Sequence, residues 1–294
     1  MPLPRRRLLA GFGLFGIAAC TPDPTVLGDH VSAPPSVTPT MGPGIGELTV
    51  ALADLAVAVR EQPEPYGSAA LAHIAAWQER LLTADPVLGG EAIFPHPTSS
   101  IPPSPELAAM SAASVQAATA ALVTATEQPL RLLLVSILLG ATGLANTESL
   151  PSQSGPVPSS YPEETAETAL GVALTHVWAL QQALEKGLGV IPGNDPARGS
   201  VAARLIDVKH LRNWLIEAAG PERPRQDTHY DLPMITDASS LQTARISLES
   251  SLMDGLAAVV AAGQADWLPD AVAQVTQVQA LGGQLPIWPG WSDS

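Results

Sequence analysis

Cysteine, aromatic residues and lysine are all scarce in this chain of 294 residues. Cys20 is the only cysteine, so no intramolecular disulfide can form and stability must come from packing. Aromatic residues make up only 4% of the chain although 46% of it is hydrophobic, so the core must consist mainly of Leu, Val and Ala. Because aromatic residues favour strands and are few, this composition indicates an all-α protein.

Basic residues are outnumbered two to one, and the formal net charge is −14. Three of the 14 basic residues are Arg5, Arg6 and Arg7, close to the N-terminus. A chain this acidic is repelled by nucleic acid and by anionic lipid headgroups, since both carry negative charge. We therefore expect no nucleic-acid partner.

Sequence motifs of several enzyme classes are also missing. The chain contains no Gly-x-Ser-x-Gly, no phosphate-binding Gly-x-x-x-x-Gly-Lys and no His-Glu-x-x-His. Its six histidines do not cluster along the sequence. We therefore predict no catalytic residue, no metal and no cofactor, and we expect that the protein is not an enzyme.

What the sequence does contain is a specific N-terminal segment. Arg5–Arg7 precede an apolar run over residues 8–19, and the small residues Ala18 and Ala19 stand directly before Cys20. This order is typical of a secretory signal peptide, and the run is too short to span a bilayer. Ile-Ala-Ala-Cys resembles the lipobox of bacterial lipoproteins. The resemblance implies a signal peptide over residues 1–19 and lipid attachment to Cys20, exported by either the general or the twin-arginine route.

Residues 20–46 are rich in Pro, Thr, Ser and Gly. Such a segment cannot bury enough apolar surface to fold alone, and we predict a disordered tether. The chain would then be anchored to the cell membrane by the lipid on Cys20, on the extracytoplasmic face. The membrane is thus one expected partner, and an envelope protein or a homo-oligomer is another.

Hydrophobic residues at helical spacing predict four helices between residues 47 and 148. Ser104-Pro105-Glu106 has the composition of a helix start, and Pro129 separates the third helix from the fourth. Residues 132–139 are apolar on nearly every side, which predicts a central, fully buried helix. We assign residues 47–148 to an N-terminal helical bundle.

A Pro- and Ser-rich connector over residues 149–162 precedes four further predicted helices. Asp237 is placed to cap the third of them, and Pro269 to open the fourth. Trp288 and Trp291 in the tail are expected to pack back on the helices. We assign residues 163–294 to a C-terminal four-helix bundle, and a duplication of the first bundle stays open.

Several segments of the second half resemble a known family. Residues 169–177 read Ala-Leu-Gly-Val-Ala-Leu-Thr-His-Val, residues 230–233 Tyr-Asp-Leu-Pro, and residues 286–290 Pro-Ile-Trp-Pro-Gly. Together with Leu248-Glu249 they resemble an actinobacterial family of ferritin-like lipoproteins whose function is not established. The resemblance covers about residues 163–290 and implies a ferritin-like, up-down four-helix bundle, but no activity.

A di-iron site in such a bundle needs a carboxylate from each helix and two Glu-x-x-His pairs. Thr175 stands where the family has a glutamate, and the predicted final helix over residues 271–281 offers glutamines but no Glu, Asp or His. His176, Asp207, His210 and Glu249 are the remaining candidates for a metal site or a redox centre. Because this set is incomplete, we favour a metal-free bundle and keep the metal-binding protein or oxidoreductase as an alternative.

Simpler roles account for the same residues. His176 can be a histidine at the edge of the bundle that hydrogen-bonds to a neighbouring residue. Asp207 and His210, three residues apart, can be a local pair on the helix surface beside Trp214. Glu249 fits a surface ion pair with Arg245, four residues earlier. Trp77 and Trp178 are expected in the core, although each could line a pocket.

Taken together, these patterns predict an exported, lipid-anchored helical protein that acts as a binding or scaffolding module. An alternative to both this role and the metal protein is a carrier that holds a small apolar molecule between helices. A dry pocket larger than ~300 Å³ in the structure would favour the carrier.

Overall fold

The computed structural model describes residues 40–99, 101, 105–155, 157–158 and 164–291. The predicted signal peptide, Cys20 and most of the predicted tether lie outside these residues, as does Ser104. The described residues belong to one compact unit.

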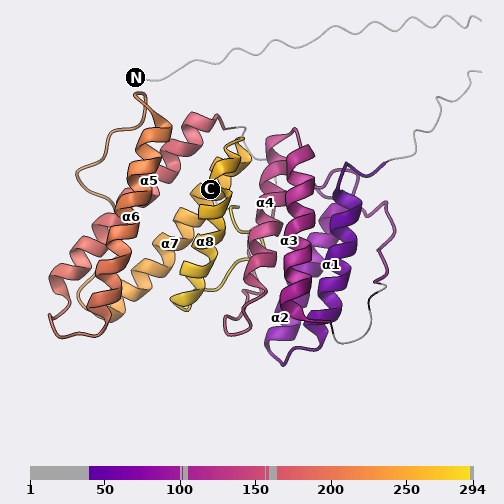
Figure 1. The fold of residues 1–294 in the computed structure, drawn as a ribbon, viewed down its shortest axis with the longest axis horizontal. Coiled ribbons are helices and arrows are strands. Elements are labelled where there is room, and N and C mark those ends of the chain that lie inside the picture. The colour runs from indigo at the N-terminus through magenta and orange to yellow at the C-terminus, as the bar shows by residue number, and fades with distance from the viewer. Residues whose placement is uncertain (1–39, 100, 102–104, 156, 159–163, 292–294) are drawn as a thin grey trace, which may run out of the picture. The chain divides into compact units, whose positions relative to one another are not determined.

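Within the described residues the fold is all-α, as predicted, with eight α-helices and no strand (Figure 1). A single 3₁₀ turn, Ala265–Trp267, precedes the last helix. The helices are α1 Ile45–Arg60, α2 Tyr66–Leu81, α3 Leu107–Thr124, α4 Gln128–Gly143, α5 Ala166–Val190, α6 Ala197–Ala219, α7 Ala238–Ala261 and α8 Leu268–Ala280.

Local sequence chemistry sets several helix ends. The Asp237 side chain accepts a hydrogen bond from the Ser240 amide, and the Ser240 hydroxyl oxygen accepts one from the Asp237 amide, a capping box that starts α7. Pro129 and Pro269 lie in the first turns of α4 and α8, where the missing amide hydrogen costs nothing. Gly220 ends α6 with a positive φ of 68°, which glycine adopts without strain.

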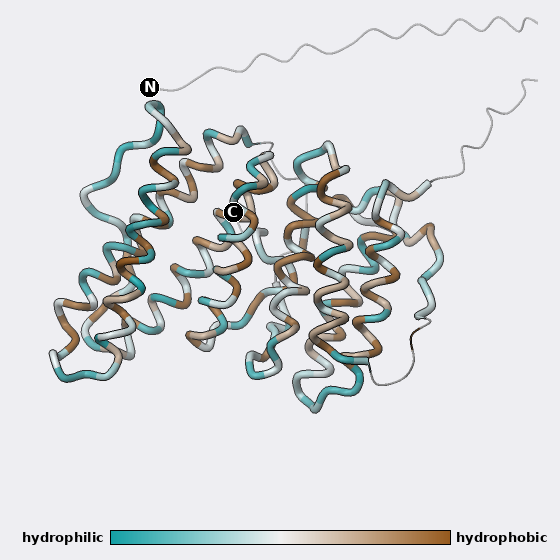
Figure 2. Tube along the Cα trace, viewed as in Figure 1, coloured by the Kyte–Doolittle hydropathy of each residue, from teal (hydrophilic) through white to brown (hydrophobic). Residues whose placement is uncertain are grey.

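The N-terminal half, α1–α4, is organised around α3 and α4. Helix α1 packs on α2 and α3, and α3 packs on α4. Every side chain from Leu132 to Leu139 is fully buried, which confirms the predicted central helix. The reason is that α4 is covered by α3 on one side and by α7 and α8 on the other, and Figure 2 shows hydrophobic residues on its successive turns.

Helix α3 is the one described helix that is long and apolar enough to cross a membrane. This is a statement of length and composition only. In the structure α3 packs against α1 and α4, and a third of its residues are buried.

The C-terminal half, α5–α8, is less evenly packed. Helix α5 lies along α6 and α7, and α7 lies along α8, but α6 makes no extensive backbone contact with α7 or α8. Helix α6 buries only Val201, Val208, Leu211 and Leu215. It is therefore an edge helix, held on one side by α5.

The C-terminal tail, described to Trp291, packs back between the halves as the sequence predicted. Trp288 and Trp291 are buried, and Trp77 of α2 donates from Nε1 to the Ile287 carbonyl at 2.8 Å. The Ser152 amide in the connector donates to the Leu285 carbonyl at 3.0 Å. The tail thus contacts both the first half and the connector.

The side chains of Trp77, Trp178 and His73 also belong to the core. Trp77 is fully buried and Trp178 nearly so, as expected of core residues. The His73 ring meets Trp77 edge-on at a centroid distance of 5.7 Å and donates from Nε2 to the Ser152 carbonyl. Burial lowers the pKa of His73, which favours the neutral ring.

Asp254 of α7 holds the end of the tail. Its Oδ1 accepts a hydrogen bond from the Gly290 amide at 2.7 Å. Gly290 has a φ of 91°, and a Cβ there would lie 2.8 Å from Cβ of Ala257. Burial raises the pKa of the Asp254 carboxyl to about 6.

This raised pKa predicts a pH dependence that Asp254→Asn should remove. The pKa of the Asp254 carboxyl is higher in the folded state than in the unfolded state, so the protonated carboxyl stabilises the fold. This stabilisation is complete below pH ~4 and is lost as pH rises through about 6. Asparagine keeps the acceptor for Gly290 without the charge. We expect the variant to be more stable than the parent by up to ~3 kcal/mol above pH 6 and equal near pH 4, measured by urea unfolding. A difference that is constant with pH would contradict this assignment.

Candidate functional site

Glu249, one of the candidate ligands, lies inside the C-terminal half with its side chain fully buried. Arg204 of α6 binds its carboxylate with two hydrogen bonds, Nε to Oε1 at 2.9 Å and Nη2 to Oε2 at 2.7 Å. The side chain of Arg204 is 11% exposed. In this bidentate ion pair the planar guanidinium faces the planar carboxylate.

Gln274 of α8 completes what we call the Arg204 cluster, made of Arg204, Glu249 and Gln274. Its Nε2 donates to Oε2 and to the backbone carbonyl of Glu249, and its Oε1 accepts from Arg204 Nη2 at 2.9 Å. The cluster therefore joins α6, α7 and α8 through side chains where α6 lacks backbone contact.

The expected surface pair of Glu249 with Arg245 is wrong. Glu249 is buried and its partner is Arg204, so the interaction is an interior one. Arg245 is also buried, and no hydrogen bond satisfies its Nε. The pKa of Arg245 is lowered overall, because burial lowers it more than the Glu249 carboxylate raises it, and the nearby Arg204 lowers it further. Two guanidinium groups thus lie near a single carboxylate.

The other candidate ligands do not join Glu249. His176 of α5 is half-buried against Gly255 of α7, and burial lowers its pKa. Asp207 and His210 are exposed on α6 and line a groove of about 300 Å³ beside Asp270 of α8. Among the described residues, no three His, Cys, Asp or Glu side chains gather as a metal site requires.

The chemistry of the Arg204 cluster does not fit a di-iron centre. Both carboxylate oxygens of Glu249 already accept hydrogen bonds, and a guanidinium keeps its proton in proteins. A metal ion beside Arg204 would meet a fixed positive charge, and the helix opposite offers the amide of Gln274 in place of a carboxylate. The interior position is therefore occupied by the Arg204 guanidinium and its counterion, the Glu249 carboxylate.

Sequence reasoning missed Arg204 and Gln274, although a signal for Arg204 was present. The buried positions of α6 follow the spacing 201, 208, 211 and 215, and residue 204 continues that pattern as an inward-facing position. A charged residue in a core register is rare unless it is paired. Only the fold, however, identifies Glu249 as the partner.

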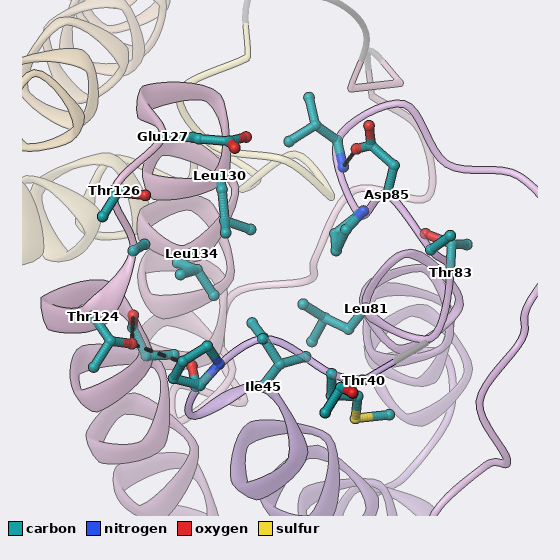
Figure 3. A pocket seen from close by; sticks show the side chains of 18 of the residues that line it. Thr40, Ile45, Leu81, Thr83, Asp85, Thr124, Thr126, Glu127, Leu130 and Leu134 are labelled. Carbon is teal, nitrogen blue, oxygen red and sulfur yellow. Dashed lines mark hydrogen bonds between the residues drawn. The ribbon is translucent and has the colours of Figure 1, made fainter. Parts of the chain in front are cut away.

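A second candidate site is a pocket of about 350 Å³ at one end of the N-terminal half, called the N-terminal pocket below (Figure 3). It lies among the start of α1, the end of α2, the end of α3 and the start of α4. Figure 3 shows Ile45, Leu81, Leu130 and Leu134 around its inner wall. Its rim is polar and includes Thr40, Thr83, Asp85, Thr124, Thr126 and Glu127.

Asp85 at this rim already has hydrogen-bond partners, because its Oδ1 accepts from the amides of Val87 and Leu88. The Thr83 and Thr124 hydroxyls likewise donate to backbone carbonyls, so the rim presents mainly oxygen acceptors around an aliphatic interior. The arrangement suits a small, mostly apolar molecule with a polar end.

Comparisons with known proteins add no family. No protein-family profile matches the chain, and no curated protein or solved structure matches it significantly.

The buried pair predicts a large effect from a single amide substitution. Glu249→Gln leaves the Arg204 guanidinium without its counterion, and we expect a loss of about 3–5 kcal/mol in the free energy of unfolding. Glu185→Gln is the matched control, since Glu185 pairs with Lys209 at 3.0 Å but both side chains are more than 40% exposed. The control should cost less than ~1 kcal/mol. Equal losses in urea unfolding would contradict the interior role of Glu249.

Proposed function

We propose that this protein is a lipid-anchored helical binding module on the extracytoplasmic face of a cell membrane, with a metal-free, ferritin-like C-terminal bundle. One observation carries the metal-free part. The inward carboxylate of Glu249 is neutralised by Arg204 and bonded by Gln274, so an ion pair takes the place that metals take in redox bundles of this type.

The helix neighbours support the ferritin-like part of the proposal. Helix α5 lies between α6 and α7, and α7 lies beside α8, so a ring of four would close between α6 and α8. The Arg204 cluster spans that remaining side through hydrogen bonds. The short sequence resemblances over residues 163–290 point the same way.

A second candidate function, the carrier of a small apolar molecule, is favoured by the N-terminal pocket. Its volume of about 350 Å³ lies within the range of small-molecule sites. Thr40 at its rim follows Cys20 by 20 residues, at most ~70 Å of extended chain. A lipid on Cys20 would therefore keep the pocket within reach of the bilayer surface.

The anchor is tested by Cys20→Ser, which removes the only thiol that could be acylated. We expect the variant to lose incorporated palmitate and to move from the membrane fraction to the soluble fraction of cells. Thr21→Ser serves as the matched control and should stay with the membranes. Sedimentation of Cys20→Ser with membranes would refute the anchor.

The metal-free bundle is tested by metal analysis of the purified chain. We expect iron and manganese to be substoichiometric after gel filtration, because no three His, Cys, Asp or Glu side chains gather among the residues that the structure describes. Incubation with Fe²⁺ or Mn²⁺ should leave the melting temperature unchanged. Stoichiometric metal retained through gel filtration would overturn the proposal in favour of the metal-binding alternative.

A further inference from the structure

The N-terminal pocket carries side-chain charge of one sign only. Asp85 and Glu127 line it, and no lysine, arginine or histidine stands among the described residues around it. Both carboxylates belong to exposed residues. Figure 3 shows them on opposite sides of the pocket, Asp85 beyond α2 and Glu127 at the start of α4. The rim thus presents two negative charges and no positive side chain to a molecule that enters.

Most oxygens of these two carboxylates are open to a donor from outside. Asp85 uses Oδ1 for the amides of Val87 and Leu88, and its Oδ2 has no partner among the described residues. Glu127 is the N-cap residue of α4, but its side chain does not cap the helix. Neither of its oxygens bonds to another described residue. Three carboxylate oxygens therefore remain as acceptors.

The threonine hydroxyls add acceptors of the same kind. Thr83 Oγ1 donates to the Arg80 carbonyl at 2.8 Å, and Thr124 Oγ1 donates to the Ala121 carbonyl at 2.8 Å. A hydroxyl has a single proton, so a hydroxyl that already donates can offer a ligand only its lone pairs. The polar end of a matching ligand must therefore be a hydrogen-bond donor.

The helix ends around the pocket do not alter its sign. Helices α1 and α4 start there, and each brings about half a positive charge, whereas α2 and α3 end there, and each brings about half a negative charge. These four partial charges roughly cancel. The full charges of Asp85 and Glu127 therefore decide the electrostatic preference of the pocket, which is for a cation.

Below the rim the wall of the pocket is apolar. Met41, Phe94 and Leu130 line it and are only half-buried, so each keeps surface that a ligand can cover. Ile45 and Leu81 lie behind them in the buried core. An alkyl chain suits such a wall, because it covers apolar surface and has no polar group to leave unpaired.

We propose that the N-terminal pocket binds alkylamines, small apolar molecules whose polar end is a protonated primary amine. The alkyl chain packs on Met41, Phe94 and Leu130. The ammonium lies at the rim and donates to the carboxylates of Asp85 and Glu127. An ammonium has three donors and no acceptor, so it matches a rim of acceptors. A fatty acid of the same length fits the wall but brings a third negative charge to the rim.

This inference rests on the carrier function, the second candidate above, and names the polar end of the carried molecule. It depends neither on the lipid anchor nor on the Arg204 cluster.

The test uses the chain from residue 21 onward, which keeps every described residue, so that neither a lipid nor a detergent competes for the pocket. Isothermal titration calorimetry at neutral pH compares octylamine, 1-octanol and octanoate, which share one chain length and end in a positive, a neutral and a negative group. We expect octylamine to bind about tenfold more tightly than octanoate, with octanol between them. Ethylamine keeps the ammonium without the chain and should bind about tenfold more weakly than octylamine.

The outcomes separate the inference from the carrier function. Octanoate that binds as tightly as octylamine would overturn the inference and leave the carrier function standing. Binding of none of the three would overturn both. Ethylamine that binds as tightly as octylamine would show that the apolar wall is not used, and this too would overturn the inference.

Charge variants at the rim locate the binding. Glu127→Gln should weaken octylamine about threefold and leave octanol unchanged, and Glu127→Lys should make octanoate bind more tightly than octylamine. Glu106→Gln is the matched control. Glu106 is the N-cap residue of α3, as Glu127 is of α4, and neither side chain caps its helix, but Glu106 does not line the pocket. The control should leave the affinity for all three ligands unchanged.

Asp85→Asn provides a second, independent variant. Asparagine keeps an oxygen acceptor for the amides of Val87 and Leu88, so the turn is retained while the charge is lost. We expect this variant to weaken octylamine about threefold, with octanol unchanged. Circular dichroism checks that each variant folds. Unchanged octylamine affinity in both Glu127→Gln and Asp85→Asn would overturn the assignment of the ammonium to this rim.

Discussion

The buried pair between Arg204 and Glu249 is the interaction on which the C-terminal half depends. Removing two charges from water costs several kcal/mol for each ion, and only close geometry with further hydrogen bonds recovers that cost. Here the guanidinium makes two bonds to the carboxylate, and Gln274 bonds to both partners. The pair also explains how α6 stays in place. This helix buries only four side chains and lacks extensive backbone contact with α7 and α8, so Arg204 provides the link that packing does not.

Helix α4 has the corresponding role between the halves. Its residues 132–139 are buried because α3 covers one side while α7 and α8 cover the other, and the tail adds Trp288 and Trp291 to the same core. The N-terminal pocket lies beside the start of this helix, where Leu130 and Leu134 line it. Another groove, of about 300 Å³, lies between α6 and α8, where Arg204 and Gln274 of the Arg204 cluster line it.

Local patterns were enough to predict most of the helices and some of their ends. The Asp237 cap, the proline at the start of α8 and the burial of residues 132–139 depend on neighbours in sequence, and each is found. The partner of Glu249 could not be predicted in this way, because Arg204 is 45 residues distant and competes with Arg245, which is only one helical turn away. Which polar groups meet is decided by tertiary packing, which the hydrophobic pattern of a single helix does not encode.

The central claim is that an ion pair, and not a metal ligand set, holds the interior of the C-terminal half. A double-mutant cycle with Arg204→Met and Glu249→Leu tests it most directly, since it isolates the coupling between the two side chains. We expect each single variant to be strongly destabilised and the double variant to recover much of the loss, with a coupling of about 2–3 kcal/mol in urea unfolding. Losses that simply add in the double variant would contradict it.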